Sequence, residues 1–259
     1  YSYANYYYAY LSRERLKDPR IQRAAPSADA AGFLASVSFP KRRFAEDFRA
    51  TPTTLARSER LRLLLSAGLD YFAEIEARFG GRTDSQTHLL AMDMANEFTV
   101  RGQPSKSIRW MKALAPNYLK MPIETAPRDF WKLLFPLPWR GSLELYATEQ
   151  GLDPFLVAGL IRQESEFDHA VVSHSYAHGL MQIMPGTGVE LNRQVGLRGY
   201  SRLALFDPTT NLRLGTFYLN NLLKRFNQRW EETLASYNAG PGRVRGWLDA
   251  TPAQVEPWE

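Results

Sequence analysis

One carboxylate of this sequence lies where the helical pattern predicts an apolar side chain. Val157, Ile161 and Glu164 share one face of a helix predicted over 154–167, because positions three and four apart are neighbours on a helix. Burial disfavours the ionised form of a carboxyl group, and so does the negative end of a helix. A general acid must stay protonated near neutral pH, which this setting favours. Glu164 is therefore a candidate catalytic acid; the alternative is a buried glutamate that pairs with an arginine or caps a loop.

Two segments that follow are punctuated by glycine and rich in hydrogen-bonding side chains. They read GLMQIMPGTG over 179–188 and ASYNAGPGRV over 235–244. Gln182 and Asn238 can both donate and accept hydrogen bonds, as recognition of sugar hydroxyl and acetamido groups requires. Met184 and Tyr237 offer apolar surface for the face of a sugar. The alternatives are loop capping for the polar pair and core packing for the apolar pair.

In these motifs the sequence resembles the soluble lytic transglycosylases of bacterial cell walls, which are related in fold to goose-type lysozyme. The resemblance rests on RQESEF, Ser173, GLMQIMPGTG, FDPTTNLRLGTFYLNNLL and YNAGPGRV, in the order of the family, and it covers about residues 141–259. It implies an all-α protein in which N-terminal superhelical, solenoid-like helices precede a compact lysozyme-like domain. The segment DFWKLLFPLPW resembles the lead-in of the large soluble members.

The resemblance also implies roles for individual residues. Glu164 matches the acid of the Glu-Ser pair of the family, and Ser173 matches a serine that hydrogen-bonds the substrate near that acid. The other expected substrate-binding residues are Gln182, Met184, Tyr218, Tyr237, Asn238 and Ala239. For Ser173 loop capping is the alternative, and Tyr218 stands where the family often has an aromatic residue.

Position 176 departs from the family pattern. The family usually has glycine where this chain has Tyr176, so a backbone with positive φ there would be strained. His169, His174 and His178 fall close together, but their spacing fits no zinc signature, and no calcium-binding loop of the EF-hand type occurs. We therefore expect no metal and no cofactor.

The sequence offers no convincing second carboxylate beside Glu164. Glu166 falls on the opposite helix face, and Asp168 lies where the predicted helix ends, so capping is its expected role. Ordinary glycosidases need two carboxyl groups. The resemblance implies instead an intramolecular path that cleaves the MurNAc–GlcNAc β-1,4 bond and leaves a 1,6-anhydroMurNAc end. A lysozyme-like hydrolase that uses Asp168 and a non-catalytic peptidoglycan-binding scaffold are the alternatives.

Composition and charge set the wider limits. The chain has 259 residues, no cysteine and a net charge of +5, and no apolar run approaches the roughly 20 residues of a membrane span. Residues 1–140 hold 22 Lys/Arg against 14 Asp/Glu, whereas residues 141–259 hold 10 against 13. The basic half could favour an anionic polymer, or it could be an ordinary solvated surface. No nucleic-acid motif accompanies it.

The expected partner is therefore the peptidoglycan glycan strand, at a periplasmic or cell-envelope location. The chain is expected to be a monomer with neither an integral membrane segment nor a nucleic-acid partner. It opens on YSYANYYYAY, in which Tyr3, Tyr7 and Tyr10 recur at helical spacing, and this predicts a fragment or processed form whose upstream part is missing.

Apolar periodicity predicts helices throughout. In the first half they fall at 54–67, at 69–79 with Gly80-Gly81 as the end signal, at 84–100, and from about 104 to 114. Paired helices of this length indicate a stacked solenoid. The prolines within 129–140 interrupt the pattern, which predicts domains at 1–136 and 137–259.

The second half is also predicted to be helical. Helices are expected at 142–150, 154–167, from 208 onward and at 231–237, with no convincing strand. Asp153-Pro154 and Asp207-Pro208 are start signals, with aspartate as N-cap and proline at the first helical position.

Overall fold

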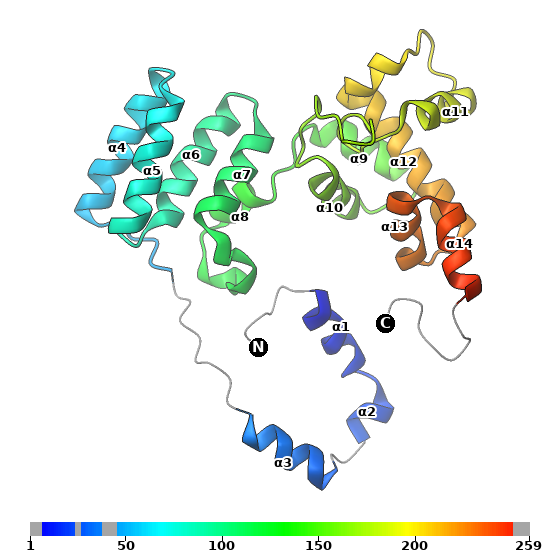
Figure 1. The fold of residues 1–259 in the computed structure, drawn as a ribbon, viewed down its shortest axis with the longest axis horizontal. Helices are drawn as coiled ribbons and strands as arrows, with labels where there is room; N and C mark the ends of the chain where they lie inside the picture. The colour runs from blue at the N-terminus through cyan, green and yellow to red at the C-terminus, as the bar shows by residue number, and fades with distance from the viewer. Residues whose placement is uncertain (1–6, 24–26, 38–45, 251–259) are drawn as a thin grey trace. The chain divides into compact units, whose positions relative to one another are not determined.

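The computed structural model describes residues 7–23, 27–37 and 46–250 and is all-α (Figure 1). Within these ranges, β structure is limited to the isolated bridges Val172–His178 and His178–Ile183. The chain divides into two compact units, residues 1–136 and 137–259. Of the tyrosines at 3, 7 and 10, Tyr3 lies outside the described residues, and helix α1 spans Tyr7–Arg15.

The first unit is built from short helices followed by stacked helical hairpins. After α1 come α2 (Pro19–Arg23) and α3 (Ala28–Ser36). The hairpins are α4 (Pro52–Ser66) with α5 (Asp70–Thr83) and α6 (Thr87–Val100) with α7 (Pro104–Leu114), which lie side by side in Figure 1. The unit ends with η1 (Pro116–Lys120), η2 (Ile123–Thr125) and α8 (Arg128–Leu134). This is the superhelical arrangement that the sequence predicts.

The apolar faces of α4 to α8 form one continuous core. Leu61, Leu90, Met94, Met111 and Phe130 are all fully buried in it. Each helix contributes one apolar stripe, so a single hairpin buries its stripe only by stacking on the next.

Gly80 and Gly81 do not end a helix, contrary to the sequence prediction, because α5 continues through them to Thr83. Gly80 is buried, and a Cβ atom there would collide with the Arg57 side chain and lie 2.6 Å from Leu90 Cδ1. Glycine is therefore required at this position by close helix packing rather than by a turn.

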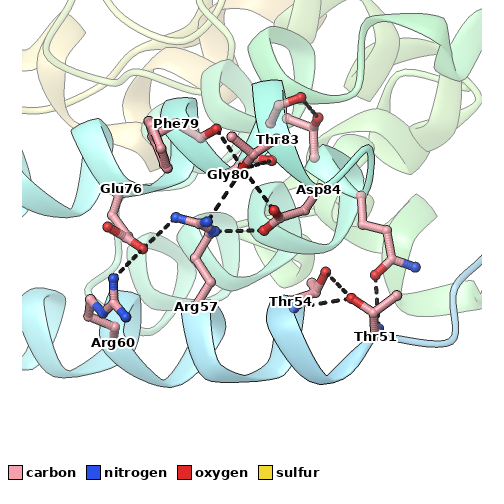
Figure 2. A network of polar contacts seen from close by, with 12 residues as sticks. Thr51, Thr54, Arg57, Arg60, Glu76, Phe79, Gly80, Thr83 and Asp84 are labelled. Atoms are coloured by element: carbon pink, nitrogen blue, oxygen red, sulfur yellow. Dashed lines mark hydrogen bonds and ion pairs between the residues drawn. The ribbon is translucent and has the colours of Figure 1, made fainter.

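The side chain that approaches Gly80 belongs to a buried ion-pair network (Figure 2). Arg57 on α4 donates from Nε to Asp84 Oδ2 at 2.7 Å and from Nη1 to Glu76 Oε1 at 2.7 Å. The Arg57 and Asp84 side chains are only 10% and 7% exposed. The hydrogen bond from Arg57 lowers the pKa of Asp84, so this pair stays charged and fastens α4 to the end of α5.

The second unit is built around one long central helix, α12. It comprises α9 (Arg140–Glu149), α10 (Pro154–Glu164), α11 (Pro185–Val195), η3 (Arg202–Phe206), α12 (Pro208–Arg225), α13 (Trp230–Ala239) and α14 (Pro241–Ala250). Helices α9, α11 and α13 all pack on α12. The predicted stripe Leu212, Leu219, Leu222 and Phe226 is buried, which gives the lysozyme-like domain its core.

Both predicted start signals form. Asp153 Oδ1 accepts from Phe155 N at 2.8 Å, and Asp207 Oδ1 accepts from Thr210 N at 2.8 Å. The end of α10 differs from the prediction, because the helix stops at Glu164 instead of about Phe167. Helix α14 was not expected from the sequence.

Candidate active site

Glu164 is the last residue of α10 and is half-buried. Its burial raises the pKa of its carboxyl group above the ordinary value. The chain leaves the helix abruptly at this point, because Glu166 and Phe167 have left-handed φ values of 50° and 61°. Phe167 is nevertheless 2% exposed, so burial of its ring compensates for the unfavourable backbone conformation. The helix end thus fixes Glu164 at the start of the loop 165–184.

Three side chains, one from the start of the loop and two from helices, hold the middle of that loop. Ser165, next to Glu164, donates from Oγ to Leu180 O at 2.8 Å. Asn211 on α12 accepts from Met181 N at 2.8 Å, and Tyr237 on α13 donates to Met181 O at 2.7 Å. We call Ser165, Asn211 and Tyr237 the loop clamp. Together they fix the Leu180–Met181 backbone relative to Glu164.

Asn211 is a site residue that the sequence reasoning missed. It is fully buried, and its Nδ2 also donates to His178 O at 2.9 Å and to Leu205 O at 2.7 Å. A signal was available, because Asn211 occupies the helical stripe that continues through Gly215 and Leu219. It is a polar residue on a buried face, which is the same signal that identified Glu164.

Glu164 and two tyrosines come together from three helices. The Tyr237 hydroxyl is buried, and burial raises the pKa of Tyr237 well above its ordinary value, with further upward contributions from Glu164 and Tyr218. The Tyr218 and Tyr237 ring centroids lie 5.3 Å apart. Burial also raises the pKa of Tyr218. The tyrosines therefore remain neutral and form an aromatic wall beside the carboxyl group.

Ser173 and Gln182 lie in the loop 165–184 and stabilise it. Ser173 Oγ accepts from Ala177 N at 3.0 Å. Gln182 has a left-handed φ of 48°, and its Nε2 donates to Gly179 O at 2.8 Å and to Val171 O at 3.4 Å. Both side chains therefore make the loop contacts that were the alternative to substrate binding in the sequence analysis.

The remaining predicted site residues lie at helix ends. Met184 is the N-cap residue of α11 and is 43% exposed. Asn238 is exposed in the last turn of α13, directly after Tyr237, and Ala239 ends that helix. The structure thus places Tyr237 near Glu164 and packs Tyr218 against Tyr237, whereas no hydrogen bond joins Met184, Asn238 or Ala239 to Glu164 among the described residues.

The nearby acidic side chains have other roles. Asp168 Oδ1 accepts from Ala170 N at 3.1 Å, which caps the turn after α10. Glu166 and Asp168 each have further interactions.

The three histidines are held separately rather than around a common point. The His169 ring nitrogen Nδ1 lies 3.1 Å from Phe206 O, and His178 stacks on the Phe206 ring at 4.7 Å. His174 is exposed. Within the described ranges, no group of three His, Cys, Asp or Glu side chains is placed to bind a metal ion.

The fold and this site define an all-α, lysozyme-like domain with one half-buried carboxyl group beside an aromatic wall. Residues 143–256 match the family model of the Transglycosylase SLT domain. The matched residues all lie in the second unit, so the similarity to the SLT domain concerns that unit.

Curated relatives share this domain. The chain is 37% identical over 123 residues to Soluble lytic murein transglycosylase of Escherichia coli (strain K12), an alignment that covers 47% of this chain and 19% of the relative. It is 34% identical over 113 residues to Membrane-bound lytic murein transglycosylase C of Salmonella arizonae, covering 40% of this chain and 31% of the relative. The chain thus spans about a fifth to a third of the length of these relatives.

Solved structures resemble nearly the whole chain. An inactive variant of lytic transglycosylase Slt from Pseudomonas aeruginosa, with one glutamate replaced by glutamine, has a TM-score of 0.61 at 26% identity. The similarity covers 97% of this chain and 36% of that one. The 70 kDa soluble lytic transglycosylase Slt70 from Escherichia coli has a TM-score of 0.56 at 25% identity, covering 95% and 39% of the two chains.

Proposed function

We propose that this chain is a peptidoglycan lytic transglycosylase that cleaves the MurNAc–GlcNAc β-1,4 bond and forms 1,6-anhydroMurNAc ends. The observation that carries the proposal is the half-buried Glu164, whose pKa is raised by burial and which lies within the residues that match the SLT domain. The named relatives, which are lytic murein transglycosylases, support it.

Glu164 serves as both acid and base in the proposed reaction. Its protonated carboxyl group gives a proton to the glycosidic oxygen as the bond to C1 of MurNAc breaks. The substrate's own N-acetyl carbonyl stabilises the positive charge at C1. The Glu164 carboxylate then takes the proton of the C6 hydroxyl, whose oxygen bonds to C1. The proton returns to Glu164, so the cycle closes without water.

The loop clamp and the aromatic wall prepare the site for this reaction. Because Tyr237 uses its hydroxyl proton to hold Met181 O, its ring is fixed in orientation. With Tyr218 it provides an apolar wall that keeps water from the C1 centre. In this proposal Ser173, Gln182, Met184, Asn238 and Ala239 complete the glycan-binding surface around Glu164.

A hydrolase of the same polymer would need a second carboxylate to activate water. Asp168 is the nearest such residue in sequence, but its carboxylate caps the turn at Ala170. We therefore expect anhydro ends as the main product, no incorporation of ¹⁸O from labelled water, and near wild-type activity in Asp168→Asn. Labelled reducing ends together with an inactive Asp168→Asn variant would contradict the lyase assignment and support the hydrolase.

The decisive variant is Glu164→Gln, which keeps the shape of the side chain but cannot donate the proton. Loss of general acid–base catalysis typically lowers the rate by about 10²–10⁴-fold, and more is expected when one group serves both steps. The inactive glutamate-to-glutamine variant of the Pseudomonas aeruginosa relative supports this design. Release of anhydromuropeptides, measured by mass spectrometry, should fall by this factor while the circular dichroism spectrum is unchanged. A folded variant with near wild-type release contradicts the assignment and favours a non-catalytic scaffold.

The place of action that fits this proposal is the bacterial cell envelope, where the substrate is found. None of the helices that the structure describes is long and apolar enough to cross a membrane. The proposal includes peptidoglycan as the partner, no cofactor, a periplasmic location and a monomeric state.

A further inference from the structure

A short hairpin, residues 171–179, projects from the loop that the clamp holds. Gly179 N donates to Val171 O at 3.0 Å, and Ser173 N donates to Ala177 O at 2.9 Å across it. At its base, His178 O accepts a hydrogen bond from Asn211, and the two residues that follow the hairpin are held by Ser165 and Tyr237. The hairpin is therefore firmly attached to the site that contains Glu164.

Tyr176 lies at the tip of this hairpin in an unfavourable backbone conformation. Its φ is 64°, a left-handed value that glycine adopts freely and that a residue with a Cβ atom adopts at a cost. Its amide donates to Ser173 O at 2.9 Å, which fixes the turn. Its side chain is 72% exposed.

Comparison with other aromatic residues shows why this is unusual. In the described part of the chain, Trp139 and Phe167 also have left-handed backbones, with φ of 52° and 61°. The Trp139 ring packs on His169 at 5.8 Å, and Phe167 is 2% exposed, so contacts within the fold compensate for their conformations. The exposed ring of Tyr176 gains little from the fold. A strained backbone conformation that contacts within the fold do not compensate indicates a functional role for the residue.

We propose that Tyr176 is a specificity-determining residue whose ring stacks on a pyranose ring of the glycan strand, outside the bond that Glu164 cleaves. This inference rests on the proposed function, because it names how that site holds its substrate. Val172 in the same hairpin is 43% exposed, so the hairpin presents a second apolar side chain besides Tyr176. A pyranose presents an apolar face of C–H groups, which an aromatic ring of this size covers.

The clamp explains why such a contact favours binding. A ring on a mobile loop would lose freedom when it binds, which lowers affinity. The turn that fixes the Tyr176 backbone and the hydrogen bonds that anchor the hairpin remove much of that loss before the glycan arrives. The contact lies away from the bond that breaks, so it should act on KM more than on kcat.

The test compares Tyr176→Gly, Tyr176→Ala and Tyr176→Phe in the full chain, on glycan strands stripped of stem peptides by an amidase. We expect Tyr176→Gly and Tyr176→Ala to lose about tenfold in kcat/KM, mostly through KM, as removal of one aromatic contact implies. Tyr176→Phe keeps the ring face and should stay close to wild type. Tyr176→Gly should begin to unfold at a temperature no lower than that of wild type, because glycine relieves the backbone strain at this position.

The matched control is Phe155→Ala on α10, since Phe155 is 67% exposed in the same unit. It should leave KM unchanged. Wild-type KM in Tyr176→Gly overturns the proposal. A loss in Tyr176→Phe equal to that in Tyr176→Gly overturns stacking in favour of the hydroxyl group. A loss seen only on strands that keep their stem peptides overturns it in favour of a peptide contact.

Binding of the same stripped strands to Glu164→Gln, with and without Tyr176→Gly, separates this inference from the proposed function. The measurement needs no turnover, so it reports the contact even if the wild-type chain releases no anhydro product. Weaker binding in the double variant supports stacking, and equal binding rejects it.

Discussion

Glu164 combines two properties at the scale of a single residue. It lies on the apolar stripe of α10 that contains Val157 and Ile161, yet it ends the helix and keeps part of its surface open. Burial is the cause of its raised pKa. A carboxyl group placed this way is costly to ionise, and the same cost makes it a useful acid.

This raised pKa predicts how both stability and activity of the wild-type chain depend on pH. The folded state binds the Glu164 proton more tightly than the unfolded chain, whose glutamate pKa is about 4.3. The stabilisation that this tighter proton binding gives the folded state is complete below the unfolded-state pKa. It is lost as pH rises through the folded-state pKa. Glu164→Gln should therefore raise the thermal midpoint relative to wild type at pH 7, and less so at pH 4. The wild-type kcat/KM, which reports ionisation of the free enzyme, should fall as pH rises through the same pKa.

The control for that prediction is Glu149→Gln, which changes an exposed glutamate on α9. It should shift the midpoint equally at the two pH values. Calorimetry at pH 4 and pH 7 measures both variants. A raised pKa of Glu164 would be contradicted if the difference in thermal midpoint between Glu164→Gln and wild type were the same at pH 4 and pH 7.

Sequence reasoning at this scale predicted Glu164 as the acid but not the contacts of the loop clamp. Glu164 is conspicuous because a charge interrupts an apolar stripe. Asn211 and Ser165 are common, uncharged residues, and their role comes from where their side chains meet the Leu180–Met181 backbone. Such contacts join segments that periodicity treats as separate, so the sequence predicted Glu164 and Tyr237 as site residues but not the hydrogen bonds that position the loop.

At the scale of elements, helix starts were predictable and helix ends less so. Asp153 and Asp207 start their helices by local hydrogen bonds, which the sequence encodes directly. The end of α10 depends on a distant partner, because Ser165 donates to Leu180 O and Phe167 enters the core in a left-handed conformation. Apolar spacing continues through Phe167, so periodicity alone extends the helix too far.

Gly80 provides a prediction about element packing. In an open helix, Gly→Ala stabilises by about 1 kcal/mol. At Gly80 the added Cβ meets Arg57 and the buried Leu90, where overpacking costs about 1–3 kcal/mol. Any disturbance of the Arg57–Asp84 ion pair adds to this cost. Gly80→Ala should therefore lower the free energy of unfolding of the first unit by about 1–3 kcal/mol, measured by urea denaturation.

Gly159→Ala is the matched comparison, because a Cβ atom there meets nothing within 4 Å. Gly159 lies inside α10, so this change should stabilise the second unit by up to about 1 kcal/mol. The two variants should thus have opposite signs. A stabilised Gly80→Ala variant would show that Arg57 moves aside freely and that the glycine is not needed for packing.

At the scale of the whole molecule, the basic excess is concentrated in a short part of the chain. Residues 1–45 hold 8 Lys/Arg against 3 Asp/Glu, whereas residues 46–136 hold 13 against 11. Within the stacked hairpins, Arg57, Arg62 and Arg101 are paired with acidic side chains. The helical stack is thus close to balanced, and any attraction for an anionic polymer should come from residues 1–45.

The corresponding prediction concerns Lys41-Arg42-Arg43, which lies outside the described residues. We expect binding to insoluble peptidoglycan to weaken as salt rises past about 0.15 M, where the screening length is about 8 Å. Changing these three residues to glutamine should remove much of that salt dependence. The comparison is a triple glutamine variant at Lys106, Arg109 and Lys112 on α7, which should retain more of it. Salt-independent binding of the wild-type chain would show that the basic residues serve only solubility.

The loop clamp has a consequence for the order in which the protein is made. Its three hydrogen bonds to Leu180 and Met181 span 15, 30 and 56 positions along the chain. A ribosome delivers Glu164 and Ser165 first, Asn211 later and Tyr237 last of the four. The proposed acid is therefore synthesised long before the loop beside it can be fixed. A nascent chain that has not reached Tyr237 carries the proposed acid but not the assembled site, so the proposed activity must wait until Tyr237 has been made.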